Sequence, residues 1–124
     1  MEYVRKVDPA VFAAAADEKR ITQPLLDHDT GGKHVQINAI RTPAGGGSPA
    51  GLHTHVVDQI FYILSGTMSI EIEGQQYECP PGTLVVFPAG VPHRNWNGGT
   101  EPTVHLAVNA PSPDPNVPFA VPAS

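Results

Sequence analysis

Residues 47–66, GSPAGLHTHVVDQIFYILSG, combine a glycine-rich start with two histidines and an apolar run. His53 and His55 are separated by one residue, and side chains at positions i and i+2 of a strand point to the same face. Both imidazoles can therefore reach one metal ion. A His-x-His pair alone is weak evidence, because this spacing often occurs by chance. Residues 59–64 are rich in β-branched and aromatic side chains, which predicts a strand.

A second segment, residues 82–97 (GTLVVFPAGVPHRNWN), adds a third histidine, His93. Residues 84–87 predict a strand, and Pro88-Ala89-Gly90 ends it with a turn. His93 follows this turn and could supply a further ligand from another strand. Gln59 has the same period-2 parity as His53 and His55, so its amide oxygen could be a fourth ligand.

Alternating or apolar patterns predict further strands at residues 33–41, 67–73, 75–79 and 103–108, with a hairpin turn at Gly74. In the last of these segments the apolar residues share one face, so His105 points the opposite way. It either lines the mouth of a barrel, where it could act as a general base, or faces solvent as an ordinary surface histidine. Of these two alternatives, we expect that His105 faces solvent. Asp8 and Pro9 suit the start of a short helix that continues into AVFAAAADEKR.

Length and charge exclude several classes of protein. The chain has 124 residues, which suits one domain, and a formal net charge of −5 with a pI near 5.5. Its few basic residues are scattered, with Lys19-Arg20 the closest group, so no nucleic-acid partner is expected. No segment approaches the roughly 18 apolar residues of a membrane helix. The N-terminus lacks a signal-peptide core, which favours a cytoplasmic protein.

The two histidine segments together resemble the cupins. Residues 47–66 are similar to the first cupin motif, G-x5-H-x-H-x3-E-x6-G, except that Gln59 stands where that motif has Glu. Residues 82–97 match the second motif, G-x5-P-x-G-x2-H-x3-N, at every fixed position. The resemblance implies an all-β fold, a double-stranded β-helix (jelly-roll) barrel, here with a short N-terminal helix.

The resemblance also implies one divalent transition metal, which could be Mn, Fe, Zn, Ni or Co. Its ligands would be His53, His55, Gln59 and His93. A neutral Gln59 would leave the metal its full charge, which lowers affinity and strengthens its Lewis acidity. In the other interpretation Gln59 only packs nearby and water replaces it.

Three regions are expected: an N-terminal helix and strand arm (1–32), the cupin barrel (33–110) and a proline-rich C-terminal arm (111–124). The C-terminal arm would dock on the barrel or on a partner subunit, and we expect a homodimer. The predicted function is a metal-dependent enzyme of dioxygenase, isomerase or lyase type. Its partner would be a small anionic or enolisable substrate, which Arg41 could hold if it points inward. The alternative is a non-catalytic small-molecule-binding or sensing cupin.

Overall fold

The computed structural model describes residues 1–16, 18–48 and 51–123 of the chain. A few positions of the predicted elements lie outside these residues. They are Asp17 in the expected helical region, Pro49 and Ala50 in the glycine-rich loop, and Ser124 at the end of the C-terminal arm.

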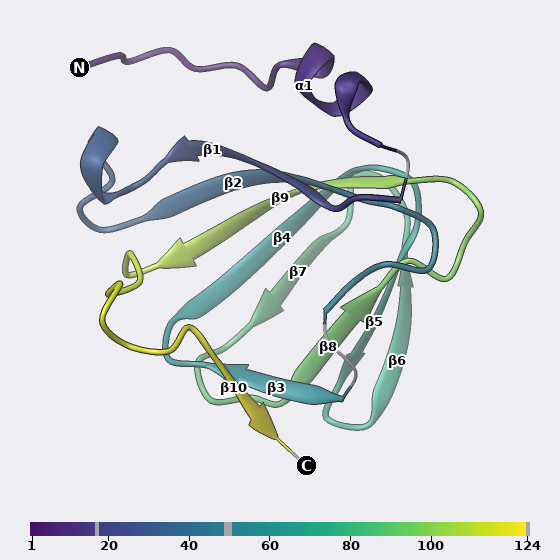
Figure 1. Ribbon diagram of the computed structural model, residues 1–124. Coiled ribbons are helices and arrows are strands. Elements are labelled where there is room, and N and C mark those ends of the chain that lie inside the picture. The colour runs from purple at the N-terminus through teal and green to yellow at the C-terminus, as the bar shows by residue number, and fades with distance from the viewer. Residues whose placement is uncertain (17, 49–50, 124) are drawn as a thin grey trace.

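Two five-stranded antiparallel sheets form the barrel (Figure 1). The first sheet has the strand order β1-β2-β9-β4-β7 and the second β10-β3-β8-β5-β6. The strand bounds are β1 (Ile21–Leu26), β2 (Gln36–Thr42), β3 (Leu52–His55), β4 (Asp58–Ser65), β5 (Met68–Ile72), β6 (Gln75–Cys79), β7 (Leu84–Phe87), β8 (His93–Trp96), β9 (Thr103–Ala110) and β10 (Ala120–Ala123). The predicted all-β fold with a short N-terminal helix is confirmed.

The N-terminal helix α1 (Pro9–Ala14) begins as the sequence indicates. The side chain of Asp8 accepts a hydrogen bond from the amide of Ala10 (2.9 Å), and Pro9 occupies the first turn. The helix ends well before the charged residues 18–20, since Ala15 is already extended. A six-residue helix is not stable alone, so its anchor is the buried Phe12. A short 3-10 turn, η1 (His28–Thr30), joins β1 to the loop before β2.

The hydrophobic core fills the space between the sheets. Phe61 and Phe87 meet edge to face with ring centroids 4.9 Å apart. Met68 and Ile70 point inward from β5 and are fully buried, as the alternation of that strand predicts. The β5–β6 hairpin turns at Glu73 and Gly74, which both have positive φ (51° and 79°), so the expected hairpin at Gly74 is confirmed.

The inner face of β9 is the one that carries His105. Thr103, His105, Ala107 and Asn109 are buried, whereas the alternating apolar residues are only partly covered. The default expectation that His105 faces solvent is therefore wrong. The alternation separates the two faces correctly but does not say which one is enclosed.

The N-terminal segment lies beside the outer face of β9. Met1 and Tyr3 border one surface hollow together with Ile37 of β2 and Leu106 of β9. Figure 1 shows this segment running along the outside of the first sheet. The outer face at Leu106 thus adjoins the N-terminal segment across this hollow.

Both arms join the sheets. β1 pairs with β2, and β10 pairs with β3, so the C-terminal arm docks on the barrel of its own chain. To do so, residues 111–119 cross from the end of β9 to the opposite sheet (Figure 1). The three-region division and the homodimer stay predictions. In the part of the chain that the structure describes, no helix is long and apolar enough to span a membrane.

Candidate metal centre

The three motif histidines converge from two neighbouring strands of the second sheet. His53 and His55 lie on β3, and His93 begins β8 directly opposite His53 in the strand register. One ring nitrogen from each residue lies within 4.8 Å of the others. The chain approaches closely here: Gly47 lies against β8, and a Cβ atom added to it would come within 2.4 Å of the Asn95 carbonyl oxygen.

Hydrogen bonds to backbone carbonyls set the proton positions on two rings. Nδ1 of His93 lies 3.0 Å from the carbonyl oxygen of Val91, and Nδ1 of His55 lies 2.9 Å from that of Phe119. A carbonyl oxygen only accepts, so each Nδ1 donates, and the lone pair of each neutral ring is on Nε2. This is the usual arrangement of metal-binding histidines.

Two buried nitrogens of the histidine cluster lack partners among the described residues, which is the observation that tests the fit of a metal. Nε2 of His93 and Nδ1 of His53 have no hydrogen bond to any described residue, and His93 is only 1% exposed. An unsatisfied buried nitrogen costs free energy, whereas a metal ion would use its lone pair. Three imidazoles in contact fit a divalent transition metal, and the residues present are suited to hold one.

Burial keeps these rings neutral. Desolvation lowers the pKa of His93 to about 4, and the nearby His53 and His55 add to the effect. Desolvation also lowers the pKa of His53, with a further contribution from His55. The pKa of His55 is lowered by desolvation, although hydrogen bonding to Phe119 and Gln59 opposes this. The neutral form that binds metal therefore predominates at pH 7.

Gln59 reaches the cluster from the other sheet and is held by a chain of amides. It lies on β4 and is buried, and its Nε2 donates to Oδ1 of Asn109 (3.0 Å). Nδ2 of Asn109 in turn donates to Oε1 of Gln36 (2.8 Å). This leaves Oε1 of Gln59 as the atom available to the histidines. Its ligand role stays a prediction, but it is placed beside His55.

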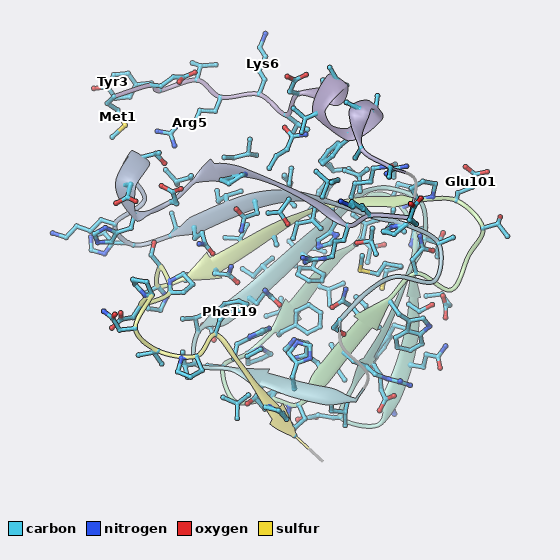
Figure 2. All side chains as sticks on the ribbon, in the orientation of Figure 1. Met1, Tyr3, Arg5, Lys6, Glu101 and Phe119 are labelled. Atoms are coloured by element: carbon cyan, nitrogen blue, oxygen red, sulfur yellow. The ribbon has the colours of Figure 1, made fainter. Side chains whose placement is uncertain are left out.

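His53 and His55 open onto a cavity of about 200 Å³ between the sheets. Phe119 closes one side, with its ring 4.1 Å from the ring of His55 between centroids. Figure 2 labels Phe119 where the C-terminal segment crosses the open end of the barrel. The cavity walls include Arg20, His53, His55, Gln59, Phe61 and Phe119. A wider hollow of about 550 Å³ shares Arg20, Gln59 and Phe119 with it.

The sequence interpretation missed Arg20, Asn109 and the role of Phe119. Arg41, the arginine it considered, lines neither hollow. The position of Asn109 could have been found, because it shares the period-2 parity of His105 on β9. No local pattern marks Arg20 or Phe119, since both reach the site from the arms of the chain.

His105 lies inside the barrel near this cavity but is not part of its wall. Its ring centroid is 4.2 Å from that of Phe61, and neither ring nitrogen has a hydrogen-bond partner among the described residues. Desolvation lowers its pKa to about 3, with a further contribution from the charge of Arg20. His105 is thus a neutral imidazole at pH 7, and its catalytic role stays a prediction.

Comparison with known families matches this fold and site. The model of the cupin domain family (Cupin_2) matches residues 40–109, more than half of the chain. The chain belongs to the cupin family. No curated protein sequence matches this cupin at a significant level.

Solved structures agree with that assignment. The cupin is 33% identical to a candidate mannose-6-phosphate isomerase from Ralstonia eutropha JMP134 (TM-score 0.62, covering 76% of this chain and 86% of that chain). It also resembles the polyketide cyclase RemF from Streptomyces resistomycificus (24% identity, TM-score 0.69, covering 81% of this chain and 70% of that chain). An RmlC-like cupin with a double-stranded β-helix fold from Methanocaldococcus jannaschii is similar as well (24% identity, TM-score 0.69, covering 90% of this chain and 92% of that chain). The last two likenesses concern the fold alone.

Proposed function

We propose that this cupin is a metal-dependent enzyme acting on a small anionic or enolisable molecule. The observation that carries the proposal is the histidine cluster: Nε2 of His93 is buried with no hydrogen-bond partner among the described residues, and His53 and His55 line a cavity. When bound, a divalent metal would supply Lewis acidity toward a substrate oxygen and stabilise negative charge on it.

The residues around the cluster support this chemistry in distinct ways. Neutral Gln59 adds no negative charge to three neutral imidazoles, so the site would keep the full charge of its cation. Phe61 and Phe119 provide apolar walls on which no charge competes with the cation for a substrate. The carbonyl oxygen of Phe119 holds the His55 ring in place.

Among the three reaction types, isomerisation has the additional support of sequence. The Ralstonia eutropha protein described as a candidate mannose-6-phosphate isomerase is 33% identical over 76% of this chain. An isomerase moves a proton next to a carbonyl group, which is the step that a cationic centre beside a carbonyl oxygen favours. We therefore place isomerase chemistry first.

Metal analysis of the purified protein tests the proposal. We expect close to one divalent transition metal per chain, and loss of that metal in the His53→Ala/His93→Ala double variant. His34→Ala, at an exposed histidine outside the cluster, is the matched control and should keep its metal. Full occupancy in the double variant would contradict the site.

Turnover separates an enzyme from a binding protein. The metal-loaded protein should exchange the proton next to the carbonyl group of small oxo-acids or sugars in deuterated water, as measured by NMR. Tight binding of such compounds with no exchange and no product would favour the non-catalytic binding module instead.

A further inference from the structure

Arg20 places a positive charge at the edge of the cavity. The residue comes directly before β1, and its side chain lines both the 200 Å³ cavity and the wider hollow of about 550 Å³. It thus shares a wall with His53, His55 and Gln59, although it is 33 residues before His53 in the sequence. It is the one Lys or Arg among the residues of the cavity wall.

Within residues 1–16, 18–48 and 51–123, no side chain or backbone group forms a hydrogen bond or an ion pair with the guanidinium of Arg20. Asp114 borders the wider hollow, but its carboxylate accepts from the backbone amide of Asn116 (2.9 Å). Arg20 remains accessible to solvent at the barrel mouth, and an incoming ligand can reach it.

The Arg20 side chain adjoins the interior of the barrel, because it lines the cavity. Desolvation lowers the pKa of Arg20, so neighbouring protein replaces part of its water even at the mouth. Its charge also acts on His105, which is fully buried and whose two ring nitrogens have no hydrogen-bond partner among the described residues. An anion bound between the mouth and the histidine cluster would compensate the positive charge of Arg20.

We propose that Arg20 binds the carboxylate group of a small organic acid whose other end lies at the histidine cluster. The inference rests on the proposed function, since it names the substrate class of the same site. A guanidinium offers two parallel N–H donors, which match the two oxygens of a carboxylate.

The size and charge of the cavity favour a carboxylate over a phosphate ester. About 200 Å³ corresponds to roughly six or seven water-sized groups, at about 30 Å³ each, which suits a short acid. One guanidinium balances the single charge of a carboxylate. A phosphate ester carries nearly two charges and three acceptor oxygens, and a single arginine would satisfy it only in part.

Asn38 and Thr22 extend the polar surface away from the histidines. Both border the wider hollow, and they lie on β2 and β1 on the same side as Gln36. Their amide and hydroxyl groups could hydrogen bond to polar groups of a ligand that extends beyond the smaller cavity.

The test compares an acid with its neutral counterpart. Binding of pyruvate and of pyruvamide to the metal-loaded protein is measured by NMR titration for the wild type and three variants. Arg20→Gln should weaken pyruvate binding roughly ten- to hundredfold and leave pyruvamide unchanged. Arg20→Lys keeps the charge but not the two-donor geometry, so its affinity for pyruvate should lie between those of the wild type and Arg20→Gln. Lys19→Gln is the matched control, because it removes the same charge from the preceding residue, which lines neither hollow.

Equal pyruvate affinity in Arg20→Gln and Lys19→Gln would overturn the inference, as would equal binding of pyruvate and pyruvamide by the wild type. Tighter, Arg20-dependent binding of inorganic phosphate would overturn the choice of a carboxylate. Circular dichroism confirms that each variant is folded. A protein that binds no metal but still shows Arg20-dependent pyruvate binding would refute the proposed function and support this inference, so the two failures are distinguishable.

Discussion

Acid should destabilise the metal-free protein through His105. Burial, followed by the charge of Arg20, lowers the pKa of this imidazole in the folded protein to about 3. In the unfolded chain its pKa returns to about 6.5. Below pH 6.5 the unfolded state therefore binds the proton more readily. The contribution of His105 to stability is complete above pH 6.5 and is lost progressively as the pH falls toward 3.

The size of the effect follows from the two pKa values. Each pH unit between them costs about 1.4 kcal/mol, so His105 alone should remove about 2 kcal/mol between pH 7 and pH 5. This is a large part of the roughly 5–15 kcal/mol that stabilises a typical domain. The histidines of the cluster add their own acid sensitivity, and a comparison with a His105 variant isolates the share of this residue.

Urea unfolding of the EDTA-treated protein at pH 7 and pH 5 measures that share. The free energy of unfolding of His105→Leu should fall by about 2 kcal/mol less than that of the wild type over this interval. His28→Leu, at an exposed histidine, should behave as the wild type does. If His105→Leu loses as much stability as the wild type, the reasoning from burial to pKa is refuted.

Two further predictions concern the shell of the metal centre. Gln59→Glu should raise metal affinity and lower turnover, because a carboxylate attracts the cation and reduces its net charge; unchanged affinity would remove Gln59 from the ligand set. Deletion of residues 111–124 should weaken metal affinity about ten- to hundredfold, because His55 loses the carbonyl oxygen that orients it. Phe119→Leu keeps this carbonyl and should bind metal nearly as the wild type does, in the same competition assay with a chelator. If the deletion and Phe119→Leu weaken metal affinity equally, the effect comes from the ring of Phe119 and not from its carbonyl oxygen.

Most strands of the barrel and the histidine cluster could be predicted from local sequence, whereas β1 and β10 were expected only as arms. Period-2 alternation reports that residues share a face, and the β5–β6 hairpin formed where its alternation and Gly74 indicated. His53 and His55 share a face for the same reason, and the motif spacing brought His93 beside them. These features depend on residues close in sequence or on a family pattern with constant spacing.

The tertiary structure alone decided which face of each strand is enclosed and what reaches the site from the arms. Alternation does not distinguish the two faces of a strand. From the sequence alone, β9 could have buried its apolar face instead of the face that carries His105. The apolar face of β9 stays partly exposed, whereas the face of His105 is enclosed between the sheets. Arg20 and Phe119 join the cavity through pairings of β1 with β2 and β10 with β3. Such contacts connect residues far apart in the chain. They contribute to stability only after the barrel has formed and brought these residues together.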